Sequence, residues 1–198
     1  MSSVQKVCDN SKNHDMDGCL KADWSKPSKE SSDMTLTYRP NVGIMIINRD
    51  KKVWIGLRSD ADKYPECCTQ MPQGGIDLGE PPVQAAWREM YEETGLTPKT
   101  AVLITQLKQW LHYDFPPYIM GRVPKGFKGQ CQKWFLFLLT GTDQDFNLHA
   151  YKKDEFSKFM WMDLKDVPDH VIDFKQNVYR QVVQEFESII QALDTRSY

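Results

Sequence analysis

Short apolar runs separated by polar segments predict a protein built mainly of strands. Residues 42–47 and 52–57 are apolar runs on either side of the polar segment 48–51, and this pattern predicts two strands joined by a turn. A nearly continuous apolar run at residues 133–139 predicts a buried strand. Further strands are predicted at residues 101–113 and 159–162, with loops at residues 59–73 and 116–129.

Two other segments have the spacing of helices. Residues 82–94 follow Pro81 and precede Gly95, which suit the start and the left-handed end of a helix. Residues 176–193 carry apolar side chains at intervals of three and four, which predicts a helix at the end of the chain. These side chains are Val178, Val182, Phe186, Ile189, Ile190 and Leu193. Strands with one helix in the middle and one at the end predict an α/β or α+β sandwich, with a mixed sheet between helices.

The first part of the chain has a different character. Residues 1–37 are rich in Ser, Lys, Asp and Asn without an apolar period, so we predict a flexible tail before one folded domain at residues 38–198. An organelle transit peptide is the alternative, which the acidic residues of this segment disfavour because such peptides avoid acids. No apolar run resembles a signal peptide or reaches the length of a bilayer span, so we expect a cytoplasmic protein without a membrane partner.

The composition limits the classes of function. The chain has 198 residues, with 25 Lys and Arg against 27 Asp and Glu, and its net charge is −2. This balance excludes a polycation that binds nucleic acid by bulk charge, and we predict no DNA partner, although a local basic patch stays open. Five cysteines without a Cys-x-x-Cys pair predict reduced thiols rather than a disulfide framework or a zinc site.

Three glutamates of the middle helix are the clearest candidates for chemistry. Glu89, Glu92 and Glu93 have i, i+3 and i+4 spacing, which places their carboxylates on one helix face. They repel one another, and the C-terminal end of the helix dipole disfavours each by roughly 0.3–1 kcal/mol. Arg88 is predicted to offset part of this charge by pairing with Glu92. A solvated acidic face is the alternative. The glycine pair that begins at Gly74 lets backbone groups approach a phosphate, and so favours a magnesium or manganese site.

The spacing of this region is also that of a known motif. A Gly is followed after five residues by Glu, and after seven more by Arg-Glu-U-x-Glu-Glu-x-Gly-U, where U is a bulky aliphatic residue. The fixed places are filled by Gly74, Glu80, Arg88, Glu89, Met90, Glu92, Glu93, Gly95 and Leu96. This pattern resembles the Nudix box. The resemblance implies the Nudix fold, an α/β/α sandwich, and hydrolysis of a nucleoside diphosphate linked to another moiety.

Four further segments extend the resemblance over about residues 38–187. They are residues 38–43 (YRPNVG), 70–75 (QMPQGG), 132–135 (QKWF) and 174–179 (FKQNVY). These segments are similar to one branch of the family, which holds plant-type asymmetrical diadenosine tetraphosphate hydrolases and bacterial RNA 5′-pyrophosphohydrolases. Residues 108–117 (KQWLHYDFPP), with residues 128–130 (KGQ), favour the plant-type members.

The resemblance assigns roles to acidic residues. It implies that Glu89, Glu92 and Glu93 bind the metal, and that Glu92 or Glu93 also orients or deprotonates the attacking water. The backbone carbonyl at Gly74 is a further candidate ligand. Glu155 resembles a distal metal-binding glutamate of this branch, and a surface loop acid is the alternative.

Residues outside the motif are candidates for substrate binding. The cations Arg39, Arg58, Lys133 and Lys175 would concentrate positive charge near an anionic substrate. Gln73, within the matching residues 70–75, is also predicted to contact the substrate.

Aromatic residues form a second group of candidates. Tyr113 and Phe174 are predicted to stack on a base or contact phosphate, with core packing as the alternative. Trp110 and Trp134 are expected in the core.

These features together predict a metal-dependent hydrolase. The leading expectation is asymmetrical cleavage of diadenosine tetraphosphate to ATP and AMP, with Mg²⁺, or Mn²⁺ in its place, as cofactor. The alternative substrate is the 5′ end of RNA, from which pyrophosphate or a cap would be removed. An alternative of another class is an inactive Nudix module that senses a nucleotide or binds a protein, although no glutamate of the box is missing. We expect a monomer.

Overall fold

The computed structural model describes residues 37–63, 68–152 and 154–198. The predicted flexible tail therefore lies outside the described residues, apart from Thr37. Thr37 begins the first strand, one residue before the predicted start of the domain. No helix in the described ranges is long and apolar enough to cross a membrane.

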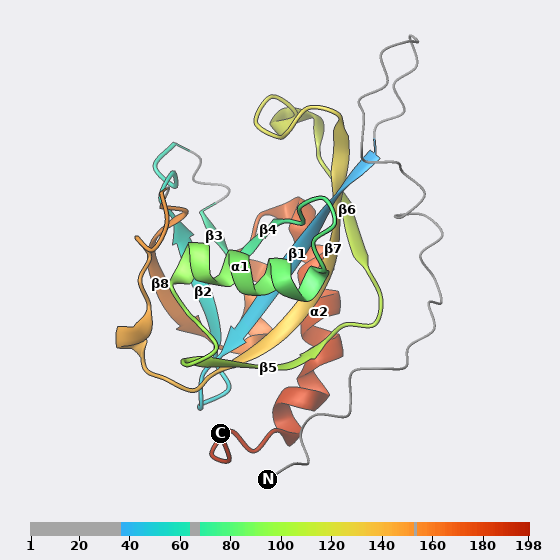
Figure 1. The fold of residues 1–198 in the computed structure, drawn as a ribbon. Helices are drawn as coiled ribbons and strands as arrows, with labels where there is room; N and C mark the ends of the chain where they lie inside the picture. Colours follow the sequence, from blue (N-terminus) through green and yellow to red (C-terminus); the bar gives the residue numbers. More distant parts are fainter. Residues whose placement is uncertain (1–36, 64–67, 153) are drawn as a thin grey trace.

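A mixed sheet forms the centre of the molecule (Figure 1). Its main strands follow the order β3-β2-β1-β7-β5, while β4 pairs with β1, β6 with β7 and β8 with β2. Strands β1 (Thr37–Ile47) and β7 (Phe127–Leu139) pair in parallel, and the other pairs are antiparallel. The remaining strands are β2 (Val53–Arg58), β3 (Thr69–Gln70), β4 (Gln73–Gly75), β5 (Ala101–Gln106), β6 (Leu111–Asp114) and β8 (Phe156–Met162).

One helix covers each face of the sheet, as Figure 1 shows. Helix α1 (Pro82–Thr94) buries Ala85, Ala86 and Met90 against one side of β1 and β7. Helix α2 (Asp173–Ala192) buries Val178, Val182, Phe186 and Ile190 against the other side. Strand β7 is apolar on both faces because it lies between two covered surfaces. The predicted α/β/α sandwich with a mixed sheet is confirmed.

The ends of the helices follow local signals in the sequence. Helix α1 occupies residues 82–94 as predicted, starts after Pro81, and ends at Gly95, whose φ of 76° is in the left-handed region. Helix α2 begins at Asp173, three residues before the predicted start. Short 3₁₀ helices occur at Pro117–Ile119, Asp143–Asp145 and Leu164–His170.

The prediction of one long strand at residues 101–113 is wrong. Strands β5 and β6 both pair with β7, but residues 107–110 form a bulge between them, in which the N–H of Leu107 keeps a backbone bond to the carbonyl of Trp134 in β7 at 2.9 Å. Gln106 pairs with Phe135, and Leu111 pairs with Gln132. The segment 107–110 therefore lies opposite only residues 133 and 134 of β7. The side chain of Lys133 donates to the carbonyl of Lys108 at 2.7 Å and so stabilises the bulge.

Other strand ends also differ from the predictions. Strand β7 starts at Phe127, six residues earlier than predicted, because it pairs with β1 from Thr37 onward. The predicted loop at 116–129 is correspondingly shorter, and the predicted loop at 59–73 contains β3 and the start of β4. Strand β8 starts at Phe156 rather than at residue 159 because it pairs with the full length of β2.

Candidate active site

The acidic face of α1 lies against the glycine-rich strand β4. The backbone N–H of Gln73 donates to Oε2 of Glu93 at 3.0 Å. The carboxylate of Glu89 lies so close to Gly74 that a Cβ at this position would collide with it. Gly74 is therefore required by close approach, and it brings the backbone of β4 against the carboxylates.

Arg88 is the centre of the ion pairs on this face. Its Nε and Nη2 donate to the two carboxylate oxygens of Glu80 at 2.9 and 2.8 Å, and its Nη1 donates to Glu89 at 2.7 Å. Nη2 also donates to the carbonyl of Gly75 at 2.8 Å. The predicted pairing with Glu92 is the loosest of these contacts, at 3.7 Å. Arg88 thus joins the loop before α1 to the acidic face of the helix.

Glu155 lies near the same carboxylates. It precedes β8 and forms an ion pair with Arg58 at the end of β2. Burial raises the pKa of Glu93 well above its usual range, and the neighbouring charges of Glu155 and Glu89 raise it further. Burial also raises the pKa of Glu89, although Arg88 opposes that shift. The structure therefore brings Glu155 into the electrostatic environment of the helix face.

The donor set fits a divalent cation in its chemistry. Within the described ranges, no three His, Cys, Asp or Glu side chains are close enough together to hold a metal ion as they stand. The guanidinium groups of Arg88 and Arg58 form ion pairs with Glu89 and Glu155 and so place positive charge beside these two carboxylates. Oxygen-only ligand sets suit Mg²⁺, and a cation would offset the burial and the repulsion that together raise the pKa of Glu93.

A cationic pocket lies next to the acidic face. It has a volume of about 420 Å³ and lies between β2, β3, the start of α2 and residues 115–126, which we call the arch. Figure 1 shows the arch rising from the sheet between β6 and β7. The pocket is lined by Arg58, Asp60, Thr69, Gln70, Ile119, Gly121, Arg122, Ile172, Phe174 and Lys175.

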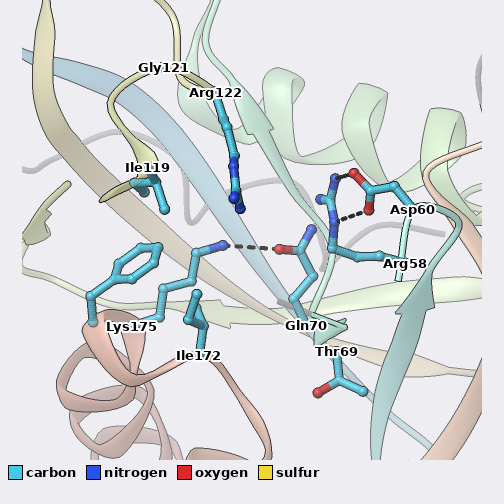
Figure 2. A pocket seen from close by; sticks show the side chains of 10 residues that line it. Arg58, Asp60, Thr69, Gln70, Ile119, Gly121, Arg122, Ile172 and Lys175 are labelled. Atoms are coloured by element: carbon cyan, nitrogen blue, oxygen red, sulfur yellow. Dashed lines mark hydrogen bonds and ion pairs between the residues drawn. The ribbon is translucent and has the colours of Figure 1, made fainter. Parts of the chain in front are cut away.

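Arg58, Phe174 and Lys175, three of the predicted substrate-binding residues, line this pocket, and Figure 2 labels Arg58 and Lys175. Arg58 enters from β2 and forms a two-pronged ion pair with Asp60, at 2.8 and 3.0 Å. Lys175 is only 9% exposed and donates to Oε1 of Gln70 at 3.0 Å. Phe174 is partly buried and lies on the pocket wall beside Lys175. An aromatic ring and several cations in one pocket suit a nucleotide with its phosphates.

The other predicted substrate-binding residues lie outside the pocket lining. Arg39 lies against Gly75 and near the charge of Glu89. Gln73 offers its backbone to Glu93, and its side chain accepts from Gln132 at 3.2 Å.

Tyr113 and Lys133 have mainly structural partners. Tyr113 is 6% exposed and donates to Gln130 at 2.7 Å, which favours the core packing alternative. Lys133 is bound to the bulge at Lys108 and lies over the ring of Trp110 at 5.8 Å. Burial lowers the pKa of Lys133.

Two polar residues, Gln70 and Arg122, are among the pocket residues that were not predicted from the sequence. Gln70 lies in the matching segment 70–75, but its side chain gave no separate signal of substrate contact. Arg122 lies in the Gly- and Pro-rich arch, where a single cation in a loop has no periodic pattern that would indicate its partners. Both positions become evident only when the arch is seen above β3 and α2 (Figure 2).

Comparisons with known proteins agree with this architecture. A family model described as NUDIX domain matches residues 37–186. RNA pyrophosphohydrolase of Bartonella henselae is 42% identical in an alignment 169 residues long, and the alignment covers 80% of this chain and 95% of that protein.

Two solved structures show the same fold. The E. coli dihydroneopterin triphosphate pyrophosphohydrolase has a TM-score of 0.60 at 21% identity, covering 76% of this chain and 97% of that one. The C. elegans Ap4A hydrolase complex has a TM-score of 0.54 at 18% identity, covering 77% and 99% of the two chains. At these identities the likeness concerns the fold alone.

The sandwich, the glycine-rich strand and the acidic helix define a class of hydrolases. The chain belongs to the Nudix family, as the box at residues 74–96 predicted. It is therefore a Nudix hydrolase.

Proposed function

We propose that this chain is an RNA 5′-pyrophosphohydrolase that cleaves a phosphoanhydride bond at a triphosphorylated 5′ end. The observation that carries this proposal is the 42% identity, over 80% of the chain, to a bacterial protein named RNA pyrophosphohydrolase. Residues 108–117 favoured diadenosine tetraphosphate instead, and that substrate is the second candidate. The relatives shift the preference because the similarity covers 95% of the protein so named as well as 80% of this chain.

Glu89, Glu92, Glu93 and Glu155, with the backbone carbonyl at Gly74, would hold the metal, for which we propose Mg²⁺. A bound divalent cation would polarise phosphoryl oxygens and lower the pKa of water. Location in the cytoplasm and a monomeric state stay predictions.

The chain's own groups would perform the remaining tasks. Glu92 or Glu93 accepts the proton of the attacking water, whose oxygen forms the new bond to phosphorus as the anhydride P–O bond breaks and pyrophosphate leaves with the electron pair of that bond. Arg58 and Lys175 neutralise the phosphates that enter the pocket, while Phe174 stacks on the first base. A phosphate-bearing nucleotide would thus lie with its anhydride toward α1 and its base toward α2.

A substrate panel tests the proposed function. With Mg²⁺ present, we expect the highest kcat/KM for triphosphorylated RNA among a set that also contains diadenosine tetraphosphate, capped RNA, ADP-ribose and deoxynucleoside triphosphates. Product analysis by chromatography measures each rate. A clear preference for diadenosine tetraphosphate would replace the proposal with the second candidate, and no turnover of any substrate would favour the inactive module.

Removing the ring of Phe174 is expected to weaken substrate binding. Phe174→Ala should lower kcat/KM for triphosphorylated RNA about tenfold, since stacking on one base contributes roughly 1–3 kcal/mol. Phe174→Tyr keeps a ring and should lose less. Steady-state kinetics should show that KM rises while kcat stays nearly constant. Equal losses of kcat/KM in the two variants would contradict stacking.

A further inference from the structure

The arch is anchored at its base rather than loosely attached. Ile119 is 6% exposed and packs in the core cluster beneath α2. The hydroxyl of Tyr118 donates to the carboxylate of Asp173, at the first residue of α2, at 2.9 Å. The backbone N–H of Arg122 donates to the carbonyl of Ile119 at 2.8 Å. Arg122 therefore sits one tight turn away from a buried anchor, which fixes the place from which its side chain extends.

The side chain of Arg122 descends from the arch into the pocket, as Figure 2 shows. It extends toward the region between Lys175 and Gln70, which come from α2 and β3. Of the three cations that line the pocket, Arg122 is exposed, Arg58 is partly buried and Lys175 is 9% exposed. Arg122 is thus the cation of the pocket most accessible to a ligand that approaches from solvent.

The walls of the pocket differ in their relation to the acidic face. Arg58 forms ion pairs with Asp60 and Glu155, so its wall is continuous with the carboxylates near Glu93. The arch carries none of these carboxylates and faces Phe174 and Lys175. A substrate would have its anhydride at the acidic face and its first base at Phe174. The group that follows its first nucleoside would then lie at the arch.

We propose that Arg122 binds the phosphodiester group that follows the first nucleoside of an RNA substrate. This inference deepens the proposed function and rests on it. The planar guanidinium can donate two parallel hydrogen bonds to phosphate oxygens, and the exposed position of Arg122 on an anchored turn keeps it within reach of a ligand. A nucleoside triphosphate lacks this phosphodiester, so Arg122 selects polynucleotides over free nucleotides and determines specificity.

Equilibrium binding tests this role without turnover. The probe is a short single-stranded RNA with a 5′-monophosphate and a 3′-fluorescein, measured by anisotropy with the full chain. Arg122→Ala should weaken binding about tenfold and lower the slope of log Kd against log salt by about 0.7, the value for one phosphate contact on a single strand. Lys125→Ala, an exposed cation of the same arch outside the pocket lining, should change neither quantity.

Kinetics with two substrates completes the test. Arg122→Ala should raise KM for triphosphorylated RNA about tenfold at a nearly constant kcat, and leave kcat/KM for diadenosine tetraphosphate within about twofold. RNA affinity and salt slope equal to wild type in Arg122→Ala, or equal losses in Lys125→Ala, would overturn the inference. If the wild type binds the probe through Arg122 but does not hydrolyse triphosphorylated RNA, the proposed function fails and the binding role stands.

Discussion

Glu93→Gln is expected to lower kcat roughly 10³-fold, in the range that positioned acid–base groups contribute. Glu93 is the carboxylate of α1 that is joined to β4, through the N–H of Gln73. It also lies within the charge field of Glu89 and Glu155. Gln keeps the shape and the oxygen that accepts this hydrogen bond, but it cannot take a proton from water or neutralise a cation. The loss should therefore appear in kcat.

The stability of the same variant should change in the opposite direction. Burial and the two neighbouring carboxylates raise the pKa of Glu93, so its charged form costs more free energy in the folded protein than in the unfolded chain. A neutral amide removes that cost. In a chelating buffer, the Tm of Glu93→Gln should equal or exceed that of the wild type. Added Mg²⁺ should raise the Tm of the wild type more than that of the variant.

Glu187→Gln is the matched control, because Glu187 is an exposed glutamate of α2 on the other face of the sheet. It should change neither kcat nor the response of the Tm to Mg²⁺. Nearly full activity in Glu93→Gln would remove Glu93 from the mechanism. A large fall of its Tm in chelator would show that its carboxylate is a structural group instead.

The sequence predicted those parts of the fold that local signals determine. Pro81 and Gly95 marked both ends of α1, and the apolar spacing of residues 176–193 identified most of α2. The break between β5 and β6 had no such signal. It depends on the register of both strands on β7 and on the bond from Lys133 to the carbonyl of Lys108, and neither is local in the sequence.

The candidate site divides in the same way. Glu89, Glu92 and Glu93 share one helix, so their spacing alone predicted a common face. The pocket combines residues from β2, β3, the arch and α2, and only the folded chain shows that Arg122 joins Arg58 and Lys175. Spacing also favoured Glu92 as the partner of Arg88, whereas the structure gives its shortest contacts to Glu89 and Glu80. Glu80 lies in the loop before α1, and an i, i+4 rule describes only contacts between residues of the same helix.

Arg88→Ala is expected to lower the free energy of unfolding by about 2 kcal/mol. The substitution removes two bonds to Glu80, one to Glu89 and one to the carbonyl of Gly75, and leaves carboxylates that are only 15% and 13% exposed without their cation. Arg88 is itself 29% exposed, so water screens part of this loss. Denaturant unfolding in chelator measures the change.

Matched variants separate this network from the general effect of losing an arginine. Arg180→Ala removes an exposed arginine of α2 whose contact with Asp169 is 3.3 Å, and it should cost less than about 0.5 kcal/mol. Arg88→Lys keeps the charge, but a lysine has no planar guanidinium to bind Glu80 and Glu89 together. Its loss of unfolding free energy should therefore lie between those of Arg180→Ala and Arg88→Ala.

A double-mutant cycle of Arg88→Ala with Glu80→Gln should give a coupling free energy of about 1 kcal/mol or more. A coupling near zero, or equal losses in Arg88→Ala and Arg180→Ala, would contradict the central place of Arg88. Activity supplies an independent measure. Arg88 holds Glu89 against Gly74, so Arg88→Ala should also lower kcat at a temperature where the variant is fully folded, whereas Arg180→Ala should not. The same guanidinium would then support both the stability of the loop before α1 and the position of a carboxylate that the reaction uses.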